Sequence, residues 1–332
     1  MRKIVMGVLA LLPLHFAGAI PESDLLRDYT RTILPYMSSA GRTGSLQGTG
    51  GVTLRYVAIE KDDEKAALVL LGGHAESYVK YAELFYDLRD LPLSIYALDQ
   101  RCQGFSGRLL ADREKDYVQS WKDYVADVKL FVDHVVKARS HRKVLVLGHS
   151  LGGSVAAVYL AEHPGDFDGA ILSAPEVRTT FGFIGTSLVR LMDLFGGGTA
   201  YVPGGGPYAE TPFDKNRETH SVARHERKLL DFREHPEIRL GFPTAHWAVE
   251  FGRLADAALA GAASIAVPVL VLKATEDVYS DGAGIDEFCR KLQYGRKVVL
   301  AGARHEILIE QDEIRGKALG EIRGFLAEQL SQ

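Results

Sequence analysis

The stretch at residues 144–153, Val-Leu-Val-Leu-Gly-His-Ser-Leu-Gly-Gly, constrains the fold of this chain more than any other. A run of branched apolar residues, typical of a buried strand, enters a G-x-S-x-G turn, and a helix-forming run follows at residues 154–163. Small residues on both sides of Ser150 allow a turn sharp enough to hold its side chain in a strained, exposed position. Glycine is frequent here, with 34 in 332 residues, so the pentapeptide needs support from the rest of the sequence.

Strand and helix patterns alternate on both sides of this stretch. Short apolar runs predict strands, and longer runs with apolar residues at helical spacing predict helices. Further predicted strands cover residues 52–59, 67–71, 94–98, 169–173, 267–273 and 297–300, and further helices cover 78–91, 119–137, 285–292 and 313–330. Strands separated by single helices indicate a parallel sheet with helices on both of its faces.

The alternation stops after Pro175. The next ninety or so residues contain no evident strand, and two glycine triplets flank a loop between helical stretches. We therefore predict an α/β fold with a mostly parallel central sheet, helices on both faces and an inserted helical cap. The predicted divisions are a polar N-terminal arm at 20–50 with one short helix at 23–34, a core at 51–175 and 265–332, and a cap at 176–264.

The first residues have the pattern of a targeting signal. Arg2 and Lys3 precede an apolar run at residues 4–16, and Ala-Gly-Ala at 17–19 matches the site that signal peptidase needs. This predicts a signal peptide at 1–19 and export to the periplasm or the outside of the cell. The alternative is an uncleaved segment that associates the protein with a membrane. No later stretch is apolar for long enough to cross a bilayer.

Charge and cysteine content exclude several classes of protein. The formal net charge of -4 provides no electrostatic basis for nucleic acid as a partner. The two cysteines, Cys102 and Cys289, are too few for a disulfide scaffold, and we expect both to be free. No cysteine or histidine cluster has the spacing of a metal site, so we expect neither a metal nor a cofactor.

A nucleophilic serine needs a base within hydrogen-bond reach and an acid that orients the base. In a parallel sheet these groups meet at the carboxyl ends of the strands. The predicted strand at 267–273 is followed by Asp277, and the strand at 297–300 is followed by His305. The order Ser150, Asp277, His305 is the order expected of an α/β-hydrolase.

Other residues compete for parts of this arrangement. Glu276 and Asp281 lie close enough to Asp277 in sequence to be the acid instead. His149 adjoins the nucleophile, but its side chain leaves the backbone in another direction, so we expect it to be a packing or hydrogen-bonding neighbour and not the base.

Acyl transfer also develops an oxyanion, which needs preorganised N–H donors. The backbone N–H of Leu151, at the start of the helix after the nucleophile, is the first candidate. The loop after the strand at 67–71 begins Gly-Gly-His, which lets the backbone approach a substrate closely. We expect the N–H of His74 to be the second donor, and the alternative is a glycine-rich turn without a catalytic part.

With these residues in place, the chain resembles the serine hydrolase family that includes lysophospholipase L2 and the monoacylglycerol lipases. The similarity runs from about Leu68 to the C-terminus. In the core it rests on residues 76–84 after the oxyanion loop, on the Asp99-Gln100-Arg101 loop with Gly104 and 106–108, and on residues 303–308 around the histidine. In the cap it rests on residues 219–221, 224–227 and 243–247. Two departures are Gly72, where histidine is common, and Cys102, which replaces a usual glycine.

The resemblance implies hydrolysis of the single acyl ester of a lysophospholipid by a metal-independent serine carboxylesterase, through an acyl-enzyme. The alternatives are a monoacylglycerol lipase or general esterase, an acyltransferase that passes the acyl group to a second lipid, and a lipid-binding pseudo-hydrolase.

Two cap segments bear on the lipid partner. The apolar residues at 181–195 either form a lid surface that meets acyl chains or a membrane, or pack against the core. A basic series either binds a phosphate or forms a solvated helix face. Its members are Arg217, Arg224, Arg227, Lys228 and Arg233.

Overall fold

A single eight-stranded sheet organises the protein. The computed structural model describes residues 19–180 and 182–331. The strands are β1 Gly41–Gln47, β2 Thr53–Ile59, β3 Ala66–Leu71, β4 Leu93–Asp99, β5 Val144–His149, β6 Gly169–Ser173, β7 Val269–Ala274 and β8 Gly295–Leu300. Their order across the sheet is β1-β2-β4-β3-β5-β6-β7-β8. The pairs from β4 to β8 are parallel, whereas β1–β2 and β2–β4 are antiparallel. The predicted, mostly parallel sheet is confirmed.

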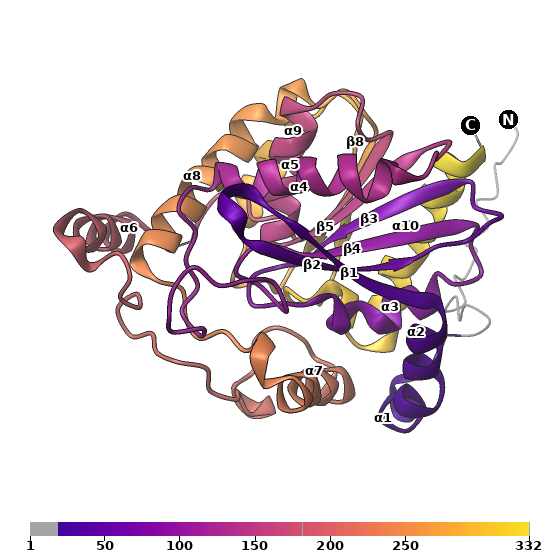
Figure 1. The fold of residues 1–332 in the computed structure, drawn as a ribbon, viewed down its shortest axis with the longest axis horizontal. Helices are drawn as coiled ribbons and strands as arrows, with labels where there is room; N and C mark the ends of the chain where they lie inside the picture. Colours follow the sequence, from indigo (N-terminus) through magenta and orange to yellow (C-terminus); the bar gives the residue numbers. More distant parts are fainter. Residues whose placement is uncertain (1–18, 181, 332) are drawn as a thin grey trace, which may run out of the picture.

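Helices cover both faces of this sheet (Figure 1). They are α1 Glu22–Asp28, α2 Leu34–Ala40, α3 Ala82–Asp87, α4 Lys122–His134, α5 Leu151–Glu162, α6 Gly182–Met192, α7 Val222–Glu234, α8 Ala245–Gly261, α9 Gly282–Lys291 and α10 Asp312–Ser331. Alternate residues of β3 face opposite sides: Val69 belongs to the core that includes residues of α4, α5, α8 and α9, whereas Leu68 belongs to the core that includes residues of α3 and α10. Two cores therefore hold the sheet between them.

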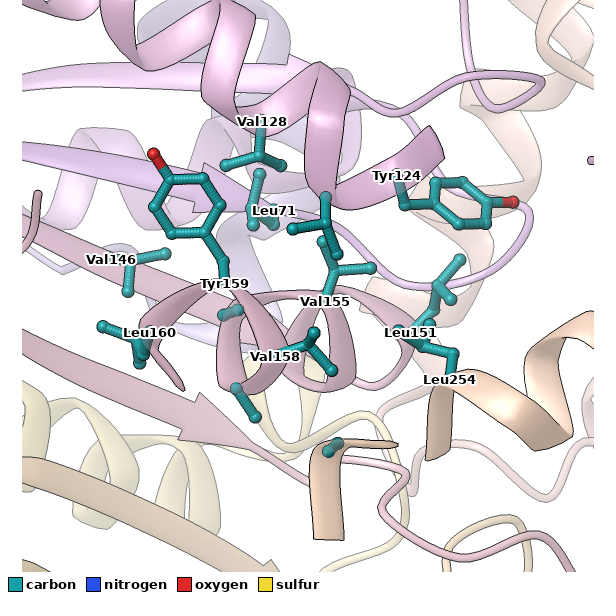
Figure 2. Packing of buried hydrophobic residues seen from close by; sticks show 14 of the residues in the cluster. Leu71, Tyr124, Val128, Val146, Leu151, Val155, Val158, Tyr159, Leu160 and Leu254 are labelled. Carbon is teal, nitrogen blue, oxygen red and sulfur yellow. The ribbon is translucent and has the colours of Figure 1, made fainter. Parts of the chain in front are cut away.

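The core on the α5 side is the one that supports the nucleophile turn. Figure 2 shows Val155 and Tyr159 of α5 in the same buried cluster as Val128 of α4 and the strand residues Leu71 and Val146. Almost every residue of α5 is buried, which explains why its sequence is apolar and small on all sides.

The N-terminal arm contains one strand more than the sequence predicted. The predicted helix at 23–34 is present as α1, a π-helical turn at Tyr29–Ile33 and the start of α2. The Gly/Ser/Thr-rich run after it forms β1, which pairs with β2 along its whole length, from Gly41 opposite Ile59 to Gln47 opposite Thr53. Its residues have little intrinsic preference for a strand, so pairing with the edge of the sheet decides its conformation.

The segment predicted to be a cap contains α6, α7 and α8, and its described residues form no strand of the sheet. Helix α6 stands away from the sheet, whereas α8 packs on α5 and contributes Trp247, Phe251 and Leu254 to the core (Figure 1). The predicted boundaries of the cap stay predictions, because α8 is continuous with the core packing.

The predicted signal peptide at 1–19 lies outside the described residues except for its last position. Among the helices that the structure does describe, none combines the length and apolar character that a bilayer crossing requires. Both cysteines are free, as expected.

Candidate active site

Ser150 occupies the turn between β5 and α5 in a strained conformation. Its φ of 52° and ψ of -119° place it among the few non-glycine residues with positive φ. The glycines around it are required by close backbone contact: a Cβ on Gly152 would lie 2.1 Å from the carbonyl oxygen of Leu71, and one on Gly148 would lie 2.5 Å from that of Gly152. The G-x-S-x-G pattern is therefore a sharp strand-to-helix turn that presents a serine.

The three residues that the sequence placed after β5, β7 and β8 converge here. His305 Nε2 lies 3.0 Å from Ser150 Oγ, and His305 Nδ1 lies 2.8 Å from Asp277 Oδ2. Asp277 Oδ1 also accepts hydrogen bonds from the backbone N–H groups of Tyr279 and Ser280, at 2.8 and 3.0 Å. The geometry is that of a serine, a base in contact with it and an acid that orients the base.

The two competing acids are engaged elsewhere. The side chain of Glu276 is 54% exposed and faces His220, with 3.3 Å between Oε2 and the ring Nε2. Asp281 caps α9 by accepting a hydrogen bond from Ala283 N–H at 2.9 Å. Of the three acids that the sequence offered, Asp277 is the one whose carboxylate contacts His305.

The two predicted oxyanion donors lie at the expected places. Leu151 is the first residue of α5, and His74 follows β3 in a loop that is tied down by Ala75 N–H donating to Gln103 Oε1 at 2.7 Å. Among the described residues, neither the His74 N–H nor the Leu151 N–H donates to a backbone or side-chain acceptor. Their role toward a substrate oxygen stays a prediction.

Comparison with known proteins places this arrangement in a family. The sequence matches the family model described as serine aminopeptidase, S33, over residues 62–312.

The chain belongs to this family.

Lysophospholipase L2 of Escherichia coli strain K12 is 36% identical to this S33-family hydrolase over 291 residues, which cover 84% of this chain and 85% of the relative. A monoacylglycerol lipase of Mycolicibacterium smegmatis is 26% identical, over 73% of this chain and 81% of the relative. Among solved structures, a thermostable carboxyl esterase from Bacillus coagulans superposes with a TM-score of 0.73 at 16% identity, covering 88% of this chain and 99% of the esterase. A Saccharomyces cerevisiae monoglyceride lipase gives 0.68 at 17% identity, covering 87% and 96%. The predicted α/β-hydrolase fold is confirmed.

Electrostatics in this S33-family site favour an ionised acid and a strongly basic histidine. Burial alone would lower the pKa of His305, but its hydrogen bond to Asp277 and the charges of Asp277, Glu176 and Glu306 raise it to about 9. Burial would raise the pKa of Asp277, but the hydrogen bond and charge of His305 and two backbone N–H groups hold it below its usual value. The imidazolium that forms during acyl transfer is therefore well stabilised.

A buried ionic cluster supports the loops from behind. Lys80 contacts the carboxylates of both Glu76 and Glu306, and Glu76 Oε2 accepts a hydrogen bond from Gly73 N–H at 2.5 Å. His149 Nε2 lies 3.2 Å from Glu306 Oε2, while its Nδ1 lies 3.1 Å from the Ser173 carbonyl oxygen. His149 is therefore a neighbour of the site that holds other contacts, as the sequence predicted.

This cluster joins the oxyanion loop to the histidine loop through one ammonium group. Glu76, His149 and Glu306 bring possible ligand atoms within 4.8 Å of one another, which is a spacing that a metal ion could use. The Lys80 ammonium group contacts both carboxylates, so it occupies the position that a metal ion would need. Sequence reasoning matched residues 76–84 to the family but assigned them no role, and the only signal was the i,i+4 spacing of Glu76 and Lys80.

Three of the five cations in the basic series of the cap follow neither predicted interpretation. Arg224 is buried and pairs with Glu83 at 2.9 Å, Arg227 is buried and pairs with Asp231 at 2.7 Å, and Lys228 pairs with Glu218. Arg233 is exposed and pairs with Glu210 at 2.7 Å. Four of the five cations are thus neutralised by acids, three of them in largely enclosed positions, where they join α7 to its surroundings.

One carboxyl group at the nucleophile was not anticipated. Glu176, the third residue after β6, accepts a hydrogen bond from Ser150 Oγ at 3.2 Å through Oε1. Its backbone carbonyl oxygen accepts a second bond from Ser154 Oγ at 2.6 Å. The sequence placed Glu176 only as the first residue of the cap, because nothing local indicates that the chain after β6 turns back over α5.

Proposed function

We propose that this S33-family hydrolase is a lysophospholipase that cleaves the single acyl ester of a lysophospholipid through an acyl-enzyme. The observation that carries the proposal is the Ser150–His305–Asp277 contact chain, at 3.0 and 2.8 Å, in a protein that shares 36% identity with lysophospholipase L2 over most of its length. The geometry supplies the chemistry, and the similarity indicates the class of lipid.

The proposed reaction has two steps, acylation of Ser150 and hydrolysis of the acyl-enzyme. Ser150 Oγ attacks the ester carbonyl while His305 Nε2 takes its proton, and His305 then returns that proton to the departing glycerol oxygen. Water repeats the sequence on the acyl-enzyme, which releases the fatty acid and restores Ser150. Asp277 orients His305 and stabilises its charged form, and the N–H groups of His74 and Leu151 bind the oxyanion in both steps.

A polar cavity beside this site fits the head group. Arg217 and Arg304 line a cavity of about 400 Å³ together with Asp277 and its neighbours. Arg217 is exposed, and Arg304 directs Nη1 to the carbonyl oxygens of Asn216 and Thr219 at 3.1 Å. Guanidinium groups bind phosphate through paired hydrogen bonds, so we propose that the phosphate of the head group lies here.

A substrate panel tests this function. Purified protein would be assayed for fatty acid release, or for nitrophenol release, from lysophosphatidylcholine, lysophosphatidylethanolamine, monoolein and p-nitrophenyl butyrate. We expect kcat/KM for the two lysophospholipids to exceed that for monoolein by about ten-fold or more, because a charged hydrogen bond to phosphate contributes about 1.5–3 kcal/mol. A preference for monoolein would instead favour the monoacylglycerol lipase alternative, which the Mycolicibacterium smegmatis relative supports. Acylated product after addition of phosphatidylglycerol would favour the acyltransferase.

The end of α6 supplies a surface for a lipid aggregate. Leu191 is 51% exposed, and Leu194 and Phe195 in the π-helical turn Asp193–Gly197 are 77% and 83% exposed. Helix α6 projects from the body of the molecule (Figure 1). Large apolar side chains at the tip of a projecting segment gain free energy when they leave water for an acyl-chain boundary, so we propose that this tip contacts membranes or micelles.

Replacing Leu194 and Phe195 together by serine is expected to lower binding to vesicles of phosphatidylcholine and phosphatidylglycerol at least ten-fold. Burying a side chain of this size contributes about 1.5–3 kcal/mol. Sedimentation with vesicles measures the binding, and hydrolysis of lysophospholipid below its critical micelle concentration should stay at the unmodified rate. Val299→Ser, at a position that is 51% exposed on β8, is the matched control. Equal vesicle binding by all three proteins would contradict the proposed surface.

A further inference from the structure

Glu176 is held against the nucleophile by its own backbone. Its carbonyl oxygen accepts the Ser154 hydroxyl at 2.6 Å, and its N–H lies 3.5 Å from the Ser150 carbonyl oxygen. The next residue, Val177, is 1% exposed, so the chain cannot easily swing away. Glu176 is half-buried as a residue, and its Oε1 contacts Ser150 Oγ. The carboxyl group therefore lies beside the oxygen that a substrate has to reach.

The position of Glu176 relative to His305 indicates which part of the substrate it meets. His305 delivers a proton to the departing alcohol, so the alcohol lies on the His305 side of Ser150 Oγ. Glu176 and His305 both contact that oxygen, at 3.2 and 3.0 Å, and their charges act on each other: burial raises the pKa of Glu176, and His305 opposes the shift. A carboxyl group is also a poor lining for an acyl-chain channel. Glu176 thus faces the alcohol part of the ester.

Acylation removes the donor that Glu176 has in the free enzyme. The single Ser150 hydroxyl proton, which is donated to Glu176 Oε1 in the free enzyme, has to turn to His305 Nε2 and pass to it as Oγ bonds to the carbonyl carbon, so Oε1 no longer receives a hydrogen bond from Ser150. A half-buried carboxylate that loses its donor is destabilised, and this cost falls in the transition state. A substrate that brings a hydroxyl group on the carbon next to the ester-bearing carbon replaces the lost donor at the required moment.

We propose that Glu176 is a specificity-determining residue that accepts a hydrogen bond from a free hydroxyl adjacent to the scissile ester. This inference rests on the proposed function, and it identifies what the site selects: monoesters of vicinal diols, which include lysophospholipids and monoacylglycerols. Esters that lack the hydroxyl, or carry a second acyl group in its place, leave the Glu176 carboxylate without a partner.

The test compares two substrates that differ in one hydroxyl group. These are 1-palmitoyl lysophosphatidylcholine and its 2-deoxy analogue, in which the glycerol is replaced by propane-1,3-diol. We expect the unmodified enzyme to favour the hydroxylated substrate in kcat/KM by about ten- to hundred-fold, the range for a hydrogen bond to a charged group. In Glu176→Leu this ratio should fall to near one, and Glu176→Gln, which keeps an acceptor oxygen, should retain a ratio above that of the leucine variant.

The ratio is insensitive to partial misfolding, because both substrates meet the same population of active sites. Glu313→Leu, at a carboxylate that is 77% exposed on α10, is the matched control and should keep the unmodified ratio. An unmodified ratio near one, or the same ratio in the enzyme and in Glu176→Leu, would overturn the proposal even if both lysolipids are cleaved. Cleavage of p-nitrophenyl butyrate without cleavage of either lysolipid would instead refute the lysophospholipase function, and the role of Glu176 with it.

Discussion

Replacing Ser150 by alanine is expected to lower kcat for lysophospholipid by about 10⁶-fold, the size of effect seen when the nucleophile of a serine–histidine–acid site is removed. Without Oγ no acyl-enzyme forms, and the remaining oxyanion donors accelerate only direct attack by water. Fatty acid release at saturating substrate measures the loss, and the absence of labelling by a fluorophosphonate checks the position of the nucleophile.

Ser154→Ala is the matched control for this prediction. Ser154 is also buried in α5, but its hydroxyl donates to the Glu176 carbonyl oxygen and does not contact His305. We expect this variant to lose about 1 kcal/mol of stability and to keep fluorophosphonate labelling of Ser150. Turnover by Ser150→Ala at the rate of the unmodified enzyme would mean that another residue is the nucleophile.

Replacing Asp277 by asparagine should lower kcat by about 10⁴-fold at neutral pH, because the amide cannot hold His305 in the tautomer that accepts the serine proton.

The pH dependence of kcat/KM should change in the same variant. With the His305 pKa raised to about 9, kcat/KM of the unmodified enzyme should rise with pH and level off above about 9, as the imidazole loses its proton and becomes a base. Removal of the Asp277 charge lowers that pKa, so the rise should move to lower pH.

Asp281→Asn makes the same chemical change four residues away. Asp281 caps α9 and pairs with Arg178 at 3.2 Å, so its loss should cost about 1 kcal/mol in the free energy of unfolding and leave the pH profile in place. If Asp281→Asn and not Asp277→Asn abolished turnover, the contact between Asp277 and His305 would not be the functional one.

A cluster of buried ions joins the loops that carry the site. Lys80 ties Glu76 in the oxyanion loop to Glu306, the residue after His305, and burial would raise the pKa of Glu306 if Lys80 and His149 did not hold it well below its usual value. Each carboxylate is enclosed and paired, an arrangement that is costly to break because a lone buried charge would remain. The cluster thus links the two loops that must meet Ser150 from opposite sides.

Local sequence patterns were sufficient for the elements and for the order of the predicted site residues. Apolar runs predicted the strands that became β3 to β7, because a strand buried on both faces has to be apolar throughout, whereas the predicted strand β8 is a largely exposed edge of the sheet. Parallel strands then bring their carboxyl ends to one edge, so residues as far apart as Ser150 and His305, 155 positions along the chain, could be placed together from sequence.

Charged residues were where sequence reasoning failed. The cap cations were expected to bind phosphate or to face water, but Arg224 is buried against Glu83, 141 residues away. A charged side chain has no periodic signature that distinguishes a buried pair from a solvated face. The partner of Arg224 is set by the packing of α7 against the first turn of α3, and sequence spacing carries no record of that packing.

The sequence by itself determined the parallel sheet, the sharp turn at Ser150 and the succession of serine, acid and histidine, because each depends on local periodicity or on the ends of strands. Tertiary structure brought Asp277, which the sequence already favoured over Glu276 and Asp281, into contact with His305. It also formed β1 from a run with little strand preference and brought Glu176 to the nucleophile. These outcomes depend on distances between segments that are remote in sequence, and such distances exist only after the two cores have packed against the sheet.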